Sequence, residues 1–169
     1  AKRYGGKTRR SVFTKEHLWQ QPEKFTKEYP VVLSTTYTAR SSLGRNGHFD
    51  YVIIDEASQA DVATGMLALS CASNTVIVGD TKQLPNVVTT LQKGQLEAIF
   101  AKYQIAKEYD SAQYSFLSSI CAIMGERAPQ VTLCEHYRCH PQIIGFCNQK
   151  FYNNELIVMT PDHGENALK

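Results

Sequence analysis

Two short apolar runs, each followed at once by polar residues, constrain this chain more than any other feature. Residues 51–54 run into an Asp-Glu pair at 55–56, and residues 75–78 run into Gly-Asp at 79–80. Apolar residues at helical spacing fill 61–72 between them, which predicts a strand, a crossover helix and a parallel strand. An open α/β sheet binds ligands beyond the carboxyl ends of its strands, where both polar pairs would lie.

The acid pair has two interpretations. Acidic side chains are favoured in the first turn of a helix, so a strand that runs into a helix would also produce this pattern. The second strand end adds Asp80 and Gln83 and favours a nucleotide-triphosphate site, where an Asp holds Mg²⁺. In such a site Asp55 suits the metal and Glu56 suits activation of water. Gln59, one helical turn further on, can reach the same crevice.

Composition indicates a globular, intracellular protein. The chain has 169 residues, of which 43% are hydrophobic and 20% charged, so it can bury a core and is not disordered. Its five cysteines are odd in number and do not form a disulfide-dense pattern, which predicts reduced thiols in the cytoplasm, or in the nucleus of a eukaryote. No run of about 18 apolar residues exists, so we expect no membrane partner. The basic start has no apolar stretch after it, so we expect no secretory signal.

Charge is distributed unevenly along the chain. The net charge of +2 neither requires nor excludes a nucleic-acid partner. Residues 1–10, however, contain several Lys and Arg and no acid. Such a segment either contacts phosphates or is a solvated arm, and its sequence leaves both open.

The remaining sequence alternates apolar runs with turn signals. Strands are expected at 31–33 and 131–133. Gly94 is expected to interrupt the chain before a helix, Gly125 to end a helix, and Pro141 to begin one as its first residue. The other expected helices cover 14–20, 96–103 and 111–124, the expected surface loop is 40–48, and the tail from Thr160 onward is expected to fray.

A third polar segment, residues 133–141, carries an arginine between an expected strand and an expected helix. Arg138 is therefore placed to reach a phosphate, which guanidinium binds through a fixed two-pronged geometry. The alternative is a surface arginine paired with an acid. Zinc binding is a further alternative for this segment, although its spacings differ from the usual zinc patterns and free thiols explain it more simply. The potential zinc ligands are Cys134, His136, Cys139, His140 and Cys147.

Three ordered motifs stand at 55–60 (DEASQA), 79–85 (GDTKQLP) and 137–141 (YRCHP). Together they resemble three motifs of the superfamily 1 helicases, and the most similar branch is the Upf-like group. Residues 32–36 resemble the motif that grips the single-strand backbone in this family, and 146–156 resemble the run that follows its arginine motif. The resemblance covers most of the chain.

The resemblance implies an α/β fold of the RecA-like P-loop NTPase type, present in part, with a parallel sheet flanked by helices. It divides the chain into a basic polar segment (1–30), the C-terminal part of a first RecA-like ATPase domain (31–128) and the start of a second (129–169). It implies ATP and Mg²⁺ as cofactors. The implied partners are single-stranded DNA or RNA and the remaining parts of a helicase chain.

The resemblance also assigns roles to single residues. Asp55 would hold Mg²⁺ together with Glu56, and Glu56 would also serve the attacking water. Gln83 would couple nucleotide to nucleic acid, and Arg138 would reach the γ-phosphate from the second domain. Further nucleotide contacts are expected from Gln59, Asp80 and Tyr137, and nucleic-acid contacts from Ser34, Thr35, Thr36 and Pro85.

The sequence departs from the helicase pattern at its start. Gly6-Lys7-Thr8 matches the end of a phosphate loop, but Ala1 stands where the first glycine belongs and no strand precedes it. The late motifs of the second domain are absent as well. We therefore expect an internal piece of a longer helicase that is inactive alone. The alternative is a non-catalytic RecA-like module that binds nucleic acid or protein. Asn86 also stands where relatives often carry a second proline.

Overall fold

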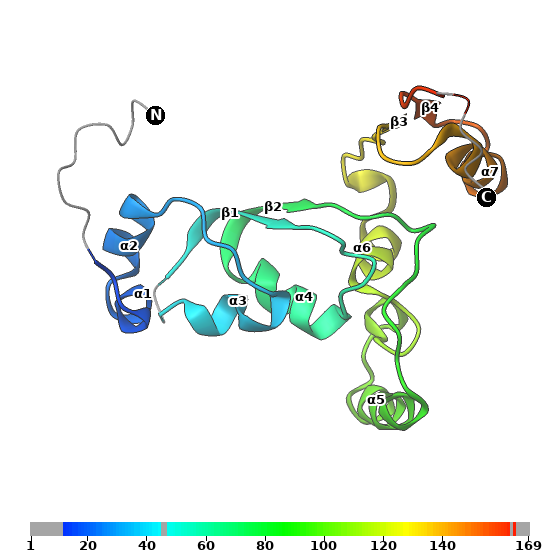
Figure 1. Ribbon diagram of the computed structural model, residues 1–169. Helices are drawn as coiled ribbons and strands as arrows, with labels where there is room; N and C mark the ends of the chain where they lie inside the picture. The colour runs from blue at the N-terminus through cyan, green and yellow to red at the C-terminus, as the bar shows by residue number, and fades with distance from the viewer. Residues whose placement is uncertain (1–11, 45–46, 163, 165–169) are drawn as a thin grey trace, which may run out of the picture. The chain divides into compact units, whose positions relative to one another are not determined.

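The computed structural model describes residues 12–44, 47–162 and 164, and it forms two compact units, Ala1–Gly125 and Glu126–Lys169 (Figure 1). The basic start at 1–10, which includes Gly6-Lys7-Thr8, lies outside the described residues, as does most of the tail after Asp162. The two units are presented separately below.

A βαβ unit forms the centre of the first unit. Strands β1 (Phe49–Ile54) and β2 (Ala72–Ile77) pair in parallel, and helix α4 (Val62–Leu69) connects them (Figure 1). The Asp61 carboxylate caps the N-terminus of α4 by accepting a hydrogen bond from the backbone N–H of Thr64 at 2.9 Å. The predicted order of strand, helix and strand is confirmed, although β2 begins before residue 75.

One face of this sheet is covered by helices. Ile54 of β1 packs in a buried cluster with Ala57, with Ala68 of α4 and with Phe116, the first residue of helix α6 (Phe116–Met124). A Cβ at Gly65 would lie only 2.2 Å from the Phe116 ring. Only glycine at this position lets α4 and α6 approach so closely.

The opposite face of the sheet is exposed. Tyr51 and Ile53 of β1 are 64% and 68% exposed, and Val76 of β2 is 44% exposed. These residues share a face because side chains alternate along a strand and Ile53 lies opposite Val76. The described part of the first unit therefore holds two parallel strands and a helical layer on one side of them, which is part of an α/β sheet of the RecA-like type.

Three short helices precede the sheet. Helix α1 (Lys15–Gln20) confirms the helix predicted at 14–20, and it packs against α2 (Pro22–Glu28). Helix α3 (Thr36–Ser42) packs against α4 and corrects the expectation of a loop over 40–48. It begins at Thr36 because the Thr35 side chain accepts the N–H of Thr38 at its start.

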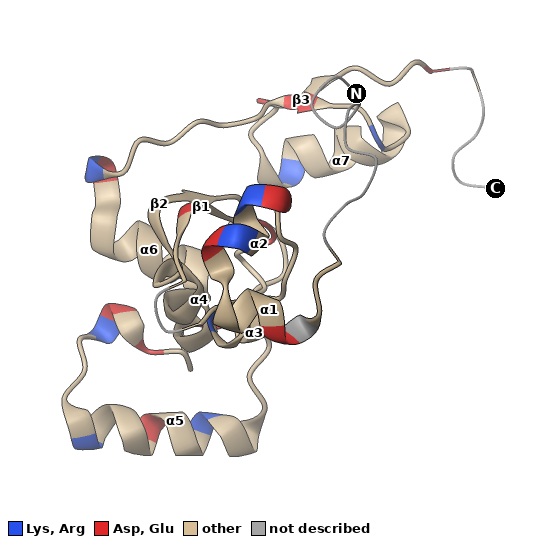
Figure 2. Ribbon diagram, turned by 90° about the vertical axis from the view of Figure 1, so that its left-hand side faces the viewer, with Lys and Arg blue, Asp and Glu red and all other residues tan. Residues whose placement is uncertain are grey.

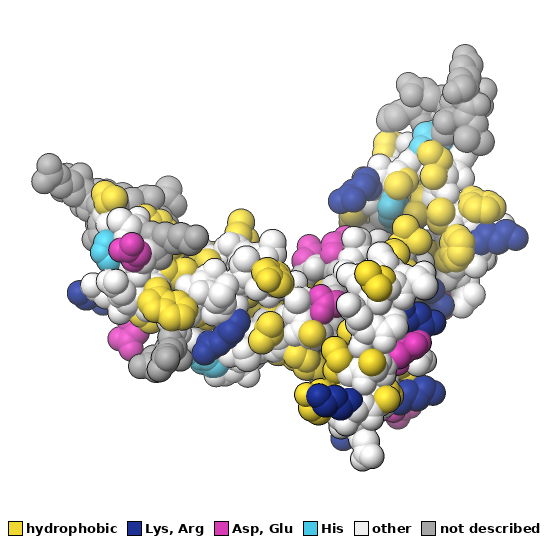
Figure 3. Space-filling view, turned by 90° about the horizontal axis from the view of Figure 1, so that it is seen from below, with side chains coloured by type: hydrophobic (Ala, Val, Ile, Leu, Met, Phe, Trp, Pro, Cys, Tyr) yellow, Lys and Arg dark blue, Asp and Glu magenta, His cyan; other side chains and the backbone are white. Residues whose placement is uncertain are grey.

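Helix α5 (Thr90–Tyr103) has no buried residue. It begins earlier than expected because Thr89 and Gln92 cap it reciprocally, and Gly94 lies inside it instead of interrupting the chain. Figure 2 shows charges of both signs along α5, of which Lys93 and Glu97 lie 4.0 Å apart. Figure 3, which views the structure from below Figure 1, shows apolar side chains among the charged ones on this surface.

Helix α6 begins later than the expected residue 111. The buried Asp110 carboxylate accepts the N–H of Ala112 at 2.9 Å and the side-chain amide of Gln113 at 2.8 Å, so this segment folds into turns. Ser115 then caps the helix, and Gly125 ends it, as predicted, with a φ of 52°. Two 3-10 turns, η1 (Lys107–Tyr109) and η2 (Gly125–Arg127), flank this region.

The second unit pairs two very short strands beside one helix. Strands β3 (Glu135–His136) and β4 (Ile157–Val158) are parallel, and α7 (Pro141–Phe151) connects them. Pro141 is the first residue of α7, as predicted. The Asn148 side chain, buried in α7, donates to the Leu156 carbonyl and accepts the Leu156 N–H, both at 2.9 Å, and so holds the chain that enters β4.

The strands expected at 31–33 and 131–133 do not form. Leu33 and Leu133 are 92% and 82% exposed, and neither run belongs to a ladder in the described part of the chain. A strand requires a neighbour for its N–H and C=O groups, and no described segment pairs with either run. An apolar, β-branched composition alone is therefore insufficient to predict a strand.

Helices in this structure are short. The longest described helix, α5, has 14 residues. None of the described helices combines the length and the apolar character that crossing a membrane requires.

Candidate functional site

The loops that follow β1 and β2 lie side by side. Two backbone hydrogen bonds extend the pairing past the strand ends: Val78 donates to the Ile54 carbonyl at 2.8 Å, and Ala57 donates to the Val78 carbonyl at 2.9 Å. Segments 55–60 and 79–86 therefore meet at one edge of the sheet, as the carboxyl ends of parallel strands should.

Asp55 and Glu56 are both exposed at this edge. Asp55 accepts the backbone N–H of Glu56 through Oδ1 at 2.9 Å, which orients its carboxylate. Glu56 has a φ of 52°, a left-handed conformation that a non-glycine residue rarely adopts. Its Oε2 accepts the side-chain amide of Gln59 at 3.3 Å. Strained backbone of this kind concentrates at functional sites, where the surrounding structure maintains it.

Asp80 and Gln83 form the second half of the edge. The Asp80 carboxylate accepts the backbone N–H of Lys82 at 2.8 Å and the side-chain amide of Gln83 at 3.3 Å. The carboxylate thus orders its own loop, while Gln83 stays exposed. Nucleotide contacts by Asp80 and Gln83 stay predictions.

Two backbone features that sequence patterns do not reveal hold the loops together. Asn86 donates its N–H to the Ser58 carbonyl at 2.9 Å. A Cβ at Gly79 would lie 3.1 Å from the Ala57 nitrogen and 3.2 Å from the Ser58 nitrogen, so glycine permits the close approach. The sequence indicates the acidic residues through their side-chain chemistry. It does not indicate these contacts, because they involve main-chain atoms.

The carboxylates at this edge fit a magnesium ion. Mg²⁺ commonly takes one or two protein carboxylates and completes its coordination with water and phosphate oxygens. Asp55 keeps Oδ2 outside its bond to Glu56, and both side chains are exposed. The donor set is therefore of the right type and number for a metal that arrives with a nucleotide.

Two of the predicted nucleic-acid contacts, Ser34 and Thr35, form a hydroxyl cluster with Thr38 at the start of α3. Thr38 Oγ1 lies 2.8 Å from Ser34 Oγ and 2.9 Å from Thr35 Oγ1, and all three residues are exposed. Thr36 is half-buried at the first position of the helix. The sequence motif missed Thr38, although its place in the same Ser/Thr run was a signal. Pro85, the remaining predicted contact, is exposed in segment 79–86.

Arg138 and Tyr137 belong to the second unit and directly follow β3. Tyr137 donates a short hydrogen bond to Glu135, and this bond to the carboxylate raises the pKa of the phenol above its ordinary value. Arg138 is exposed and makes no hydrogen bond or ion pair with any described residue. The alternative interpretation of Arg138, a surface arginine paired with an acid such as Glu135, therefore finds no support among the described residues.

The histidines and cysteines of the second unit form no metal site among the described residues. His136 Nε2 accepts the Cys139 N–H at 2.8 Å, and His140 Nδ1 accepts the Gln142 N–H at 3.2 Å. These ring nitrogens cap backbone segments, which occupies the lone pairs that zinc would need. All five cysteines of the chain are free.

Comparison with known proteins agrees with the geometry of this edge. Residues 4–91, which include β1, β2 and both loops, match the protein family described as AAA domain. The chain belongs to this family.

Relatives of this AAA-domain chain carry helicase names. It is 31% identical over 163 residues to an uncharacterized ATP-dependent helicase, MG140, of Mycoplasma genitalium, covering 91% of the chain and 14% of the relative. It is 29% identical over 129 residues to another, MJ0104, of Methanocaldococcus jannaschii, covering 76% and 17%. The probable helicase senataxin of Homo sapiens is 30% identical over 117 residues, covering 64% and 4%. The resemblance to superfamily 1 helicases of the Upf-like branch is thereby confirmed, and the chain spans only a small part of each relative.

Proposed function

We propose that this chain supplies one edge of the nucleotide site of an ATP-dependent helicase or translocase that moves on single-stranded DNA or RNA. The observation that carries the proposal is the junction of two loops at the ends of β1 and β2, where Asp55, Glu56 and Gln59 lie on one loop and Gln83 on the other. The helicase names of the relatives support it. A cytoplasmic or nuclear location belongs to the same proposal.

Each residue has a distinct chemical task in this proposal. Mg²⁺, when bound, neutralises charge on the phosphate oxygens. Asp55 is the residue to hold it, because one of its carboxylate oxygens lies outside the bond to Glu56. Glu56 takes a proton from the attacking water, and the Gln59 amide orients that carboxylate. Gln83 is the residue to contact the γ-phosphate.

The two units correspond, in this proposal, to parts of two RecA-like domains, 31–128 and 129–169. Arg138 is the residue of the second domain that reaches the transferred phosphoryl group. Its guanidinium is free for that task, since no described residue pairs with it. The hydroxyl cluster of Ser34, Thr35 and Thr38 is the surface for the phosphates of a single strand, together with Thr36 and Pro85.

A Glu56→Gln substitution in the full-length protein tests the catalytic part. The carboxamide keeps the shape of the side chain but cannot accept a proton, so turnover should fall by roughly 10²–10⁴-fold while ATP still binds. Glu97→Gln is the matched control, because Glu97 is an exposed glutamate of α5 outside the site. Turnover within a few-fold of the wild type for Glu56→Gln would remove Glu56 from the role of base.

The competing function is a binding module without turnover. It predicts that the full-length protein binds nucleic acid but hydrolyses no ATP, with or without Glu56. For the 169-residue chain alone, we expect no ATP hydrolysis, because we identify no complete phosphate loop in its sequence. Such a loop would supply the lysine and the backbone N–H groups that bind the β- and γ-phosphates. Hydrolysis by the isolated chain that is stimulated by nucleic acid and abolished by Glu56→Gln would contradict this expectation.

A further inference from the structure

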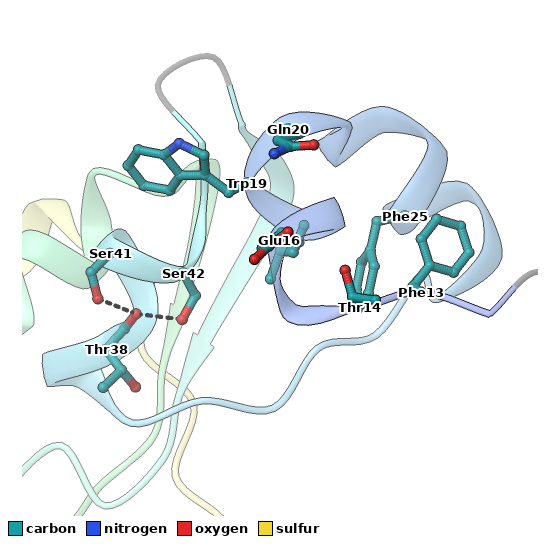
Figure 4. Close-up of a pocket in the computed structure, with 10 residues that line it drawn as sticks. Phe13, Thr14, Glu16, Trp19, Gln20, Phe25, Thr38, Ser41 and Ser42 are labelled. Carbon is teal, nitrogen blue, oxygen red and sulfur yellow. Dashed lines mark hydrogen bonds between the residues drawn. The ribbon is translucent and has the colours of Figure 1, made fainter.

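An open pocket of about 580 Å³ lies between helix α1 and helix α3 in the first unit (Figure 4). Its described lining includes aromatic side chains from the α1–α2 region and hydroxyl side chains from α3, and none of these described lining residues is a Lys or Arg. The lining residues used below are Glu16, Trp19, Gln20, Thr38, Ser41 and Ser42.

Trp19 gives the pocket an aromatic face. The Gly44 backbone packs closely against the Trp19 main chain, because a Cβ at Gly44 would lie only 2.1 Å from the Trp19 carbonyl oxygen. The side chain nevertheless stays 52% exposed. Figure 4 shows the indole extending from α1 toward the side of the pocket that carries Ser41. A half-exposed aromatic ring is a surface on which a flat group can stack.

Three polar side chains of the described lining, Ser41, Ser42 and Glu16, offer acceptors to a ligand, and the Gln20 amide offers both donors and an acceptor. The hydroxyls of Ser41 and Ser42 donate to the Thr38 carbonyl at 3.1 Å and 2.8 Å (Figure 4). Their protons are thereby used, and only their lone pairs remain available. The Glu16 carboxylate is also an acceptor, and it has no partner among the described residues. A complementary ligand is flat and carries N–H donors.

Thr38 connects this pocket to the hydroxyl cluster. Its side chain lines the pocket, and its Oγ1 lies within hydrogen-bond distance of both Ser34 and Thr35. A strand whose phosphates contact that cluster would thus pass the mouth of the pocket. The described lining residues offer an aromatic face and hydroxyl groups and include no cation, which suits a base better than a phosphate.

We propose that this pocket receives one unstacked base of the single-stranded nucleic acid, stacked on Trp19. This proposal rests on the proposed function, because the single strand that supplies the base belongs to that function. Aromatic side chains bind bases of single strands by stacking, which tolerates any base. Adenine, cytosine and guanine, unlike thymine and uracil, carry exocyclic amino donors, so the acceptor-rich rim prefers them.

Trp19 is the sole tryptophan of the chain, so its fluorescence reports on this pocket directly. The test titrates the 169-residue chain with dye-labelled, single-stranded oligonucleotides of equal length: poly(dA), poly(dT) and an abasic strand. Dye anisotropy measures binding, and indole emission, excited where bases do not absorb, measures stacking. We expect poly(dA) to quench Trp19 at saturation more than poly(dT), and the abasic strand to bind without quenching.

Substitutions at Trp19 and Glu16 test the binding energetics with anisotropy alone. Trp19→Ala should weaken poly(dA) binding roughly 5- to 150-fold, the range that stacking on one aromatic side chain contributes, and Trp19→Phe should weaken it less. Tyr103→Ala is the matched control, because Tyr103 is a 63% exposed aromatic residue of α5 outside the pocket. Glu16→Gln should narrow the preference for poly(dA) over poly(dT), because the new amide also donates.

The outcomes separate this proposal from the proposed function. Saturable binding of poly(dA) without quenching, and with equal affinity for Trp19→Ala and Tyr103→Ala, would overturn the pocket proposal and leave the nucleic-acid function intact. Absence of binding for every oligonucleotide would overturn the pocket proposal and also the assignment of nucleic-acid binding to this chain.

Discussion

The backbone N–H of Asn86 donates a hydrogen bond to the carbonyl oxygen of Ser58, 2.9 Å away, and so joins the two loops of the candidate nucleotide site. Ser58 is only 2% exposed, so water cannot easily replace this donor. The sequence resemblance leads one to expect a proline at position 86. Proline has no N–H to give, so this chain ties its loops together in a way that the expected residue could not.

Substitution of Asn86 by proline should therefore uncouple the two loops. Loss of the donor leaves a buried carbonyl unsatisfied, and the free energy of unfolding should fall by about 1–3 kcal/mol. Asn86→Ala is the matched control because alanine keeps the N–H, and it should cost far less. Urea denaturation of the 169-residue chain measures both. Equal destabilisation by the two variants would show that the Asn86 side chain, and not its N–H, matters.

The left-handed backbone of Glu56 predicts a conflict between stability and activity. Glycine adopts a φ of 52° without the steric cost that a side chain incurs, which favours the folded state of Glu56→Gly. Glycine also has more conformational entropy in the unfolded chain, which opposes this gain. The free energy of unfolding should therefore change by between zero and about +1 kcal/mol. The same variant should abolish ATP turnover in the full-length protein. Glu97→Gly, inside α5, should instead lose about 1 kcal/mol. Similar losses for the two variants would argue against strain at Glu56.

The elements that the sequence predicts well are those whose partners lie nearby in the chain. β1, α4 and β2 form one βαβ unit, and the start of α4 is set by the neighbouring Asp61 side chain. The runs at 31–33 and 131–133 have the composition of strands but no described neighbour, and composition cannot reveal this.

The candidate site could be proposed from the sequence to the extent that it consists of side chains. Acids and amides at strand ends signal Asp55, Glu56 and Gln83 directly. The bond between Asn86 and Ser58 involves only main-chain atoms, which every residue except proline offers at every position. Pockets such as the one beside Trp19 form where separate helices meet, and no local pattern encodes them.

Close packing at Gly65 predicts opposite effects for two glycine substitutions. A Cβ at Gly65 would lie 2.2 Å from the buried Phe116 ring, whereas a Cβ at Gly94 would meet nothing within 4 Å. Gly65→Ala should therefore destabilise the first unit by about 1–3 kcal/mol through overpacking. Gly94→Ala should stabilise α5 by up to about 1 kcal/mol, because alanine has the higher helix propensity. Thermal melts followed by circular dichroism would detect both shifts, and a neutral Gly65→Ala would contradict the packing described here.

Arg138 offers the clearest separation of catalysis from stability. Because it forms no ion pair or hydrogen bond with a described residue, Arg138→Ala should leave the melting temperature of the chain nearly unchanged. In the full-length protein, however, turnover should fall by roughly 10³–10⁵-fold, the contribution of an arginine that stabilises the charge of a transferring phosphoryl group. Nucleotide affinity should fall far less, because that charge develops in the transition state.

The lysine variant and a structural control complete this test. Arg138→Lys should recover little activity, since an ammonium lacks the two-pronged geometry of guanidinium. Asn148→Ala is the contrasting variant: its side chain holds Leu156 through two hydrogen bonds of 2.9 Å, so its loss should lower the melting temperature before it affects the chemistry. Turnover, nucleotide affinity and melting temperature measured on all three variants distinguish the two roles. A lower melting temperature for Arg138→Ala with unchanged turnover in the folded protein would assign Arg138 to structure instead of catalysis.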